Sequence, residues 1–265
     1  PFNQFGNVTL SNSDYNRASY DSFVSKIQKR MSSGLSLLAS WTWSRNMDAT
    51  IGGPGSFFNG LGAVQNVYNL DSEYALSSVH SPHRFSSAFT YELPFGKGKK
   101  WIGNNKIADL AIGGWSTNAV VTYQTGYPLA ITQSSNNNGS FGGGGQRPNA
   151  TGVSPVTAGG LMDRIDNYIN RAVFTEVPKY QFGNVSRTIG MRGPGISEWN
   201  MSLFKTFSIS EKLKAQFRAE ALNAFNTPQF RSPNLAFGVS NSNFGKITEQ
   251  ANFSRMIQLG VRFFF

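Results

Sequence analysis

The sequence predicts an all-β fold, and within that class an antiparallel transmembrane β-barrel with long extracellular loops. Charged residues make up only 14% of the chain, whereas aromatic residues also reach 14% and Phe alone supplies 22 residues. Apolar residues recur at every second position in about seven segments of roughly ten residues, the length that a tilted membrane strand needs. Short and long connections join these segments, as they do in outer-membrane barrels.

The first two predicted strands span 18–31 and 35–47. Alternation in the first is less regular than in the second. In the second, one face collects the apolar side chains of Leu35, Leu37, Ala39, Trp41 and Trp43. Residues 32–34, with the sequence Ser-Ser-Gly, are expected to join the two strands as a tight turn.

The next two predicted strands span 83–93 and 114–124. The apolar face of the first carries Phe85, Phe89, Tyr91 and Leu93. The corresponding face of the second carries Trp115, Ala119, Val121 and Tyr123. The positions between them are mainly Ser, Thr, Asn and Gln, which a polar lumen accepts.

Three further strands are predicted at 197–209, 213–225 and 255–265. The first is amphipathic, but Lys205 interrupts its apolar side and leaves its facing open. The second alternates Ala and Phe with charged or amide residues from Lys214 to Glu220. The last alternates Ile257, Leu259 and the following odd positions with polar residues.

The connections between these segments differ in length. Residues 32–34 and 210–212 are short, whereas 48–82, 125–195 and 226–254 are long, which matches short periplasmic turns and long extracellular loops. The connection 94–113 is longer than a tight turn, and the order of the strands makes it periplasmic. Apolar spacing within 161–170 predicts one short helix in the longest loop.

Aromatic residues gather at the strand ends that this orientation defines. The outer ends carry Trp41, Trp43, Tyr123, Trp199 and Phe225. The inner ends carry Tyr91, Trp101, Trp115 and Phe207. Two such girdles are typical of a barrel, because amphipathic rings settle at the level of the lipid headgroups. Ordinary core packing is the alternative, but it would not sort these residues by strand end.

About seven strands cannot close a membrane barrel, because the smallest known in bacteria have eight. An open sheet would leave two unpaired edges in lipid, where each unsatisfied backbone group costs several kcal/mol. The chain also begins at Pro1, with neither Met nor a signal peptide. We therefore expect 1–265 to be a fragment of a larger barrel.

Several other protein classes are disfavoured. No stretch approaches about 18 apolar residues, which excludes a helical membrane protein. The net charge of +10 does not indicate nucleic-acid binding, because basic residues are scattered except at Lys97, Lys99 and Lys100. The absence of cysteine excludes thiol ligands and nucleophiles.

The sequence shows no grouping of residues that would make it an enzyme, and it indicates no cofactor or metal. His80 and His83 are the only histidines, and two ligands do not complete a zinc site. The glycine run 142–145 lacks the Gly-Lys-Ser/Thr of a phosphate-binding loop, so loop flexibility is the better interpretation. No Gly-x-Ser-x-Gly elbow is present.

Two sets of residues are candidates for binding. Charges on the polar face would contact a plug or a solute, or else form solvated or cross-strand ion pairs; they are Lys26, Glu92, Lys214, Arg218, Glu220 and Arg262. Aromatic and basic residues in the long loops would recognise a ligand, or else only fold the loops; they are Phe57, Phe58, Tyr68, Tyr74, Phe141, Arg147, Tyr168 and Tyr180.

The last segment ends in an aromatic residue and is apolar at alternate positions, namely Ile257, Leu259, Val261, Phe263 and Phe265. It resembles the C-terminal signal that the barrel-assembly machinery of the outer membrane reads. A strand that ends in a soluble core is the alternative.

Nine further motifs, in order along nearly the whole chain, resemble the C-terminal barrel of TonB-dependent receptors of the Oar-like type, which is common in acidobacteria and often carries a carboxypeptidase-regulatory-like domain. They are SWTWS at 40–44, SPHRF at 81–85, YELPFGKGK at 91–99, GGW at 113–115, NRAVFT at 170–175, FGN at 182–184, RGPG at 192–195, FRAEALNAFN at 217–226 and FGKIT at 244–248.

This resemblance implies a 22-stranded barrel around a plug, coupled to the TonB complex through an N-terminal box. The plug and the TonB box are absent from 1–265. The implied function is active uptake of a bulky solute, such as a siderophore or an oligosaccharide, across the bacterial outer membrane. A passive porin-like or adhesion barrel is a second hypothesis, and a soluble carbohydrate-binding β-sandwich is a third.

Overall fold

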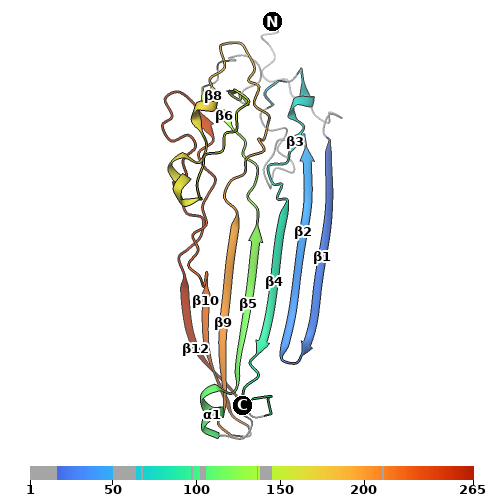
Figure 1. Cartoon of the computed structure of the whole chain (residues 1–265), viewed down its shortest axis with the longest axis vertical. Helices are drawn as coiled ribbons and strands as arrows, with labels where there is room; N and C mark the ends of the chain where they lie inside the picture. Colours follow the sequence, from blue (N-terminus) through green and yellow to red (C-terminus); the bar gives the residue numbers. More distant parts are fainter. Residues whose placement is uncertain are drawn as a thin grey trace, which may run out of the picture.

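The computed structural model describes residues 17–49, 64–66, 68–96, 98–101, 106–135, 137, 145–210 and 212–265, although not the side chains at 106 and 108. The long strands form one antiparallel sheet in the order β1-β2-β4-β5-β9-β10-β12 (Figure 1). Their bounds are β1 Ala18–Ser32, β2 Leu35–Asp48, β4 His83–Glu92, β5 Trp115–Gln124, β9 Ile196–Ser208, β10 Lys214–Leu222 and β12 Met256–Phe264. Each long strand lies within a few residues of a range expected from the sequence.

The remaining elements are short and lie in the connections between the long strands. The helices are η1 Leu70–Glu73, α1 Lys106–Ile112, η2 Met162–Asn167 and η3 Arg171–Val173. The short strands are β3 Ala75–Leu76, β6 Thr132–Gln133, β7 Asn149–Ala150, β8 Phe174–Thr175 and β11 Ala236–Phe237. The helix expected within 161–170 is present as η2, a 3-10 helix.

The strand register places the odd-numbered residues of the long strands on one face of the sheet, which we call the apolar face, except at the end of β1, where the register shifts between Lys29 and Ser32. Trp43 pairs with Phe23 and His83, and Phe85 pairs with Tyr123, so the same parity continues from strand to strand. Even-numbered residues occupy the opposite, polar face. Because side chains alternate with a period of two, a shift of one residue in any pair would break this continuity.

The register also shows which side chains of β9 lie on the apolar face. Val121 pairs with Trp199, and Phe217 pairs with Lys205, so Lys205 lies on the apolar face together with Trp199 and the other odd positions. Lys205 interrupts the apolar pattern of this face because its amino group contacts the helix α1. The alternation of the strands does not predict this helix. That contact is described below.

The lower ends of the strands are joined by tight turns and by α1 (Figure 1). Ser33 and Gly34 turn the chain between β1 and β2 with positive φ angles of 51° and 79°. A Cβ at Gly34 would lie 2.8 Å from the Glu92 carbonyl oxygen, so the close approach of β4 also requires glycine here. Between β9 and β10, the Ile209 and Ser210 amides both donate to the Leu213 carbonyl.

The upper connections pack into a layer with its own hydrophobic core. This core joins the loop between β5 and β9 to the loop between β10 and β12, and it comprises Leu129, Ile131, Tyr168, Ile169, Val173, Phe174, Val185, Met191, Phe237, Phe244 and Ile247. The rings of Phe174, Phe237 and Phe244 meet in tilted or edge-to-face arrangements, with centroid separations of 5.1 to 5.9 Å. We call this structure the loop layer.

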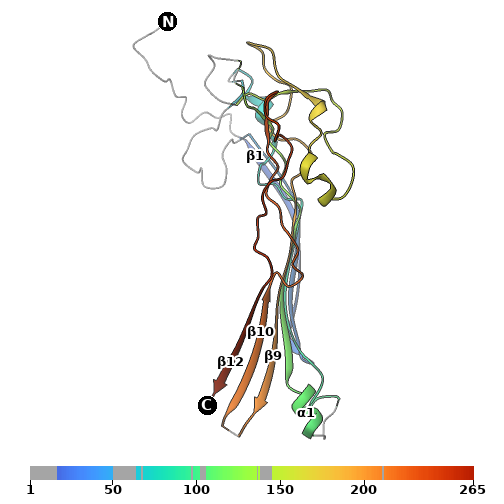
Figure 2. The same ribbon diagram turned by 90° about the vertical axis from the view of Figure 1, so that its left-hand side faces the viewer.

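The sheet is a single curved layer, and β1 and β12 are its two edges (Figure 2). A β-sandwich needs a second sheet packed against the first. Within the described ranges, the only other sheets are the two-stranded pairs β6–β11 and β7–β8. The soluble-sandwich hypothesis is therefore wrong. None of the helices in the described part of the chain is long and apolar enough to span a membrane.

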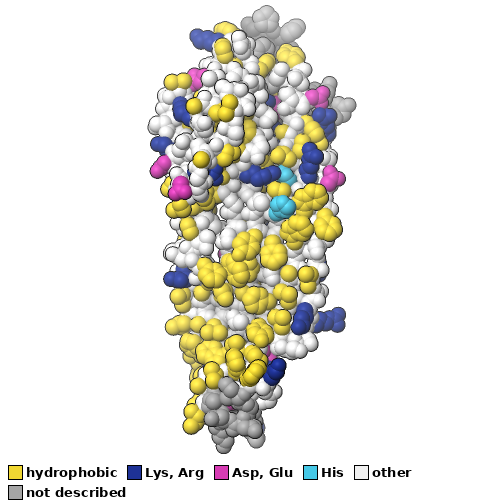
Figure 3. Space-filling model, in the orientation of Figure 1, with side chains coloured by type: hydrophobic (Ala, Val, Ile, Leu, Met, Phe, Trp, Pro, Cys, Tyr) yellow, Lys and Arg dark blue, Asp and Glu magenta, His cyan; other side chains and the backbone are white. Residues whose placement is uncertain are grey.

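Large apolar side chains gather over the strands on the face shown in Figure 3, whereas charged side chains are concentrated above them. Phe23, Trp43 and Ile257 are more than half exposed. Full burial of a large apolar side chain away from water contributes about 1.5–3 kcal/mol, and these exposed side chains lack most of that stabilisation. A contiguous apolar band of this kind indicates contact with a partner or with lipid.

Candidate functional site

The polar face brings together all six charged residues that the sequence singled out for it. Lys26 pairs with Ser40, which leads through Ser86 and Thr122 to the even positions of β9. Continuing the register places the remaining candidates on the same face: Glu92, Lys214, Arg218, Glu220 and Arg262. These charges therefore line one wall.

Neighbouring groups on this wall engage several of the charges. Lys99 Nζ lies 2.6 Å from a carboxylate oxygen of Glu92. Arg218 Nε donates to Gln216 Oε1 at 2.8 Å, and its guanidinium carbon lies 5.4 Å from the centroid of the Phe204 ring. These contacts lie between β4 and the β4–β5 connection, within β10, and between a guanidinium and an aromatic ring, so none of them is a cross-strand ion pair. The wall is polar and mainly basic between β9 and β12.

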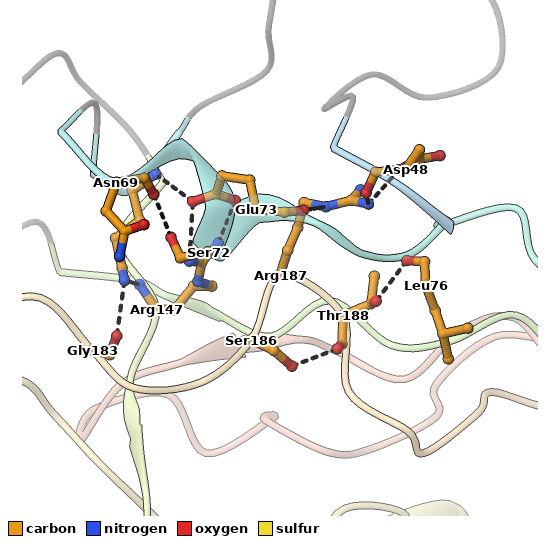
Figure 4. A network of polar contacts seen from close by, with 11 residues as sticks. Asp48, Asn69, Ser72, Glu73, Leu76, Arg147, Gly183, Ser186, Arg187 and Thr188 are labelled. Carbon is orange, nitrogen blue, oxygen red and sulfur yellow. Dashed lines mark hydrogen bonds and ion pairs between the residues drawn. The ribbon is translucent and has the colours of Figure 1, made fainter. Parts of the chain in front are cut away.

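A buried ion pair stands at the centre of the loop layer (Figure 4). Arg147 approaches Glu73 with both guanidinium ends, through Nη1 to Oε2 at 2.7 Å and Nη2 to Oε1 at 3.1 Å. The two side chains are 6% and 2% exposed. Gln65 completes the cluster, because its backbone N–H donates to Glu73 Oε1 and its side-chain Oε1 accepts from the backbone N–H of Arg147. Such a fork-to-fork pair fixes both position and angle.

A second arginine, Arg187, forms hydrogen bonds that connect the loop layer to the upper end of β2. Arg187 Nη2 contacts the carboxylate of Asp48, at the end of β2, and donates to the Asp48 carbonyl at 2.6 Å. Its Nε donates to the Glu73 carbonyl at 2.8 Å, and Thr188 Oγ1 donates to the Leu76 carbonyl at 2.7 Å. Glu73 and Arg187 were missed in the sequence, because nothing in their local pattern distinguishes a buried charge from a solvated one.

The loop residues expected to contact a ligand are divided by the structure into buried and exposed groups. Arg147 is buried against Glu73, and Tyr168 is 4% exposed with its hydroxyl donating to the Arg192 carbonyl at 2.7 Å. Both therefore build the layer and do not face solvent. Tyr74 is half-buried, with the guanidinium of Arg17 4.2 Å from its ring centroid.

The remaining loop candidates are exposed or lie outside the described residues. Tyr68 and Tyr180 are 81% and 78% exposed, so most of each residue faces solvent. Phe57, Phe58 and Phe141 lie outside the described residues. A hollow of about 620 Å³ on the loop layer presents polar groups that the sequence did not reveal, including those of Asn170, Thr175 and Glu176.

The two histidines lie in different surroundings. His80 is 4% exposed, and its Nδ1 has no hydrogen-bond partner. Burial lowers the pKa of His80, and the positive charges of Arg192 and Arg45 lower it further. His83 instead begins β4 and stacks on Trp41 at a centroid separation of 5.8 Å. Over the described ranges, no group of three or more His, Cys, Asp or Glu residues could hold a metal ion.

Aromatic rings form a belt across the upper part of the apolar face. Phe23 meets Trp41 edge-on at 6.3 Å, and Trp199 meets Phe225 at 5.4 Å. Trp199 Nε1 donates to the Tyr123 hydroxyl at 2.7 Å. At the lower end, Trp115 and Phe207 flank the amino group of Lys205 at 5.6 and 5.2 Å. The two aromatic groups therefore lie at the two ends of the same face.

The last strand, β12, forms one edge of the sheet and pairs only with β10 among the described strands. Four of the five residues proposed as the assembly signal, Ile257, Leu259, Val261 and Phe263, are 55–65% exposed on the apolar face. Phe265 is 99% exposed. The edge and the apolar stripe are therefore both accessible to a partner.

Comparison with known families gives a match along nearly the whole chain. Residues 1–258 match the family described as an outer membrane beta barrel domain. No curated protein and no solved structure matches the chain.

Proposed function

Because the chain belongs to the outer-membrane β-barrel domain family and is placed by it in the bacterial outer membrane, we propose that it forms part of a TonB-dependent receptor that takes up a bulky solute. In this proposal the apolar face contacts lipid, the polar face lines the lumen, and the loop layer binds the solute outside the cell. The solute class that we propose is a siderophore, an oligosaccharide or a molecule of similar size.

The observation that carries this proposal is the packed loop layer above a polar wall. Its buried pair, Glu73 and Arg147, and its hydrophobic core hold exposed groups such as Tyr68 and Tyr180 in place. Binding sites gain affinity when their loops are ordered before the ligand arrives. A passive pore needs a wide lumen, but it has no need of such a layer.

The larger architecture belongs to the same proposal. β9, β10 and β12 turn away from the rest of the sheet (Figure 2), as strands do in a sheet that curves toward closure. Neither edge strand, β1 or β12, is paired on its outer side by a described strand, and in lipid each unsatisfied backbone group costs several kcal/mol. We propose that further strands close a barrel of 22 strands around a plug, as the resemblance to Oar-like receptors implies.

The proposed partners follow from this architecture. The TonB complex would pull on a plug outside 1–265, and the barrel-assembly machinery would read β12 and its terminal Phe265. The residues on the polar face would contact the plug or the solute. We propose neither a catalytic role nor nucleic-acid binding.

A porin-like or adhesion barrel is the second candidate, and energy dependence separates it from the first. Cells that produce the protein would be given fluorescent oligosaccharides and ferric siderophores, with and without functional TonB. A receptor binds one of these solutes at the surface in both strains but accumulates it only when TonB functions. Accumulation that is independent of TonB would favour a passive pore, and surface attachment with no accumulation of any solute would favour an adhesin.

A further inference from the structure

The inner end of the apolar face carries a cavity that the receptor function does not use. The cavity measures about 420 Å³ and lies between α1 and the strands β5, β9, β10 and β12. Its walls are Leu110 and Ala111 of α1 and a set of strand residues with odd numbers, namely Trp115, Lys205, Phe207, Ala215, Phe217 and Val261. Since all of these strand residues belong to the apolar face, α1 covers the side of the sheet that meets lipid.

Lys205 explains how α1 is held on this face. Its Nζ donates to the Gly113 carbonyl and, at 3.3 Å, to the Asp109 carbonyl, so the end of the helix takes up the amino group. Trp115 Nε1 also donates to the Ala111 carbonyl at 3.1 Å. A charged amine is costly on a lipid-facing surface, and these carbonyls replace the water that it loses. The amino group of Lys205 thus lies at the helix, and the other side chains that line the cavity are apolar.

Three described side chains of α1 are apolar and partly or largely exposed. Ile107, Leu110 and Ile112 are 82%, 66% and 44% exposed. Just before the helix, Trp101 is 54% exposed and the amino group of Lys100 lies 5.5 Å from the centroid of its ring. An exposed apolar helix beside Trp and Lys is the composition of an element that lies in a membrane interface.

The end of the sheet at which α1 lies indicates which leaflet of the membrane supplies the lipid. The helix lies at the same end of the sheet as the short β1–β2 and β9–β10 connections (Figure 1). Short turns are periplasmic in outer-membrane barrels. The periplasmic leaflet of the outer membrane consists of phospholipid. The cavity is continuous with the apolar face, because all of its strand residues have odd numbers, and in the proposed orientation that face meets acyl chains.

We propose that α1 is an interfacial anchor and that the cavity beneath it holds an acyl chain of one phospholipid from the periplasmic leaflet. This phospholipid would remain bound when the surrounding bilayer lipid is removed, because α1 covers its chain. The inference rests on the outer-membrane location and on the apolar face, and it does not depend on TonB-driven uptake.

Native mass spectrometry tests the proposal with two matched variants. The protein purified from outer membranes would be exchanged into a non-ionic detergent with a small excess of phosphatidylethanolamine and phosphatidylglycerol. Ala215→Phe fills the cavity, whereas Ala219→Phe adds the same ring to the same face of β10 outside the cavity. We expect one retained phospholipid for the unchanged protein and for Ala219→Phe, and a loss of about tenfold or more for Ala215→Phe, because a filled pocket has no room for the chain.

Three outcomes would overturn the proposal: no retained phospholipid on the unchanged protein, equal retention by the two variants, or a second copy of the chain in place of the lipid. Heat-modifiable migration on gels would show that each variant is folded. If Ala215→Phe does not fold, Ala111→Phe fills the same cavity from the side of α1 and carries the same expectation.

Discussion

At the scale of single residues, the ion pair between Glu73 and Arg147 is the contact with the largest expected effect. Removal of one member leaves the other buried and uncompensated, which typically costs about 3–5 kcal/mol. We predict that Glu73→Gln loosens the loop layer by an amount in this range. Hydrogen exchange of the amides in 145–195 would measure the loss of protection.

The exposed pair Arg231 and Glu249 provides the control for this prediction. Its side chains are 66% and 63% exposed, at a distance of 3.2 Å. Exposed pairs contribute about 0–1 kcal/mol, so Arg231→Ala is expected to leave loop protection nearly unchanged. Equal effects of the two substitutions would show that the buried pair does not organise the layer.

His80 leads to a pH prediction. Its pKa in the folded protein is lowered, first by burial and then by Arg192 and Arg45, so below about pH 6.5 the unfolded chain takes up a proton before the folded layer does. The contribution of neutral His80 to the free energy of unfolding is therefore fully present above about pH 6.5. It decreases as the pH falls from there through the lowered pKa of the folded state.

We predict that proteolysis of the loop layer accelerates as the pH falls below about 6.5, and that His80→Gln reduces this acceleration. His83→Gln serves as the control, because His83 is exposed at the start of β4 and should leave the pH dependence as it is. An unchanged profile in His80→Gln would assign the pH dependence to other groups.

At the scale of elements, the long strands could be predicted from the sequence because a period of two is a local signal. The apolar stripe of β2, from Leu35 to Trp43, needs no information from the rest of the chain. The facing of β9 could not be predicted in this way. Lys205 is compatible with the apolar face only through carbonyls of α1, which lie more than ninety residues earlier.

The candidate site was less predictable than the strands for the same reason. Tyr168 and Arg147 resemble exposed loop residues in the sequence, yet both are buried by segments that are distant along the chain. Glu73 meets Arg147 at a separation of 74 residues, and no periodic pattern records such a contact. The six charges on the polar face, by contrast, follow from strand parity alone.

The two faces of β9 can be tested by adding the same charge to each. Leu203 lies on the apolar face and Ser202 beside it on the polar face. Leu203→Arg is expected to destabilise the protein by about 2–4 kcal/mol, as a cation does near the middle of the bilayer. Ser202→Arg should change stability much less, because the lumen wall is already polar. Urea unfolding in phospholipid vesicles would measure both.

A reversed order of these two effects would mean that the polar face meets lipid, and similar effects would mean that the sheet is not embedded. Either result would contradict the assignment of faces on which both the uptake proposal and the phospholipid site depend.

At the scale of the whole molecule, the sheet, the loop layer and α1 define one direction across the membrane. The loop layer continues the upper ends of the strands, whereas the tight turns and α1 lie at the lower ends (Figure 1). Aromatic rings mark both levels on the apolar face, and the charged wall lies on the opposite face. These features support the proposed orientation, in which the loop layer lies outside the cell and the short turns are periplasmic.

The chain contains no cysteine, so single cysteines can report this direction. Tyr180→Cys, in the loop layer, should react with a membrane-impermeant maleimide on intact cells, because this position is 78% exposed. Lys212→Cys, in the turn between β9 and β10, should react only after the outer membrane is permeabilised. The unchanged protein gives the background, and labelling of Lys212→Cys alone on intact cells would reverse the orientation and place α1 and its cavity in the outer leaflet.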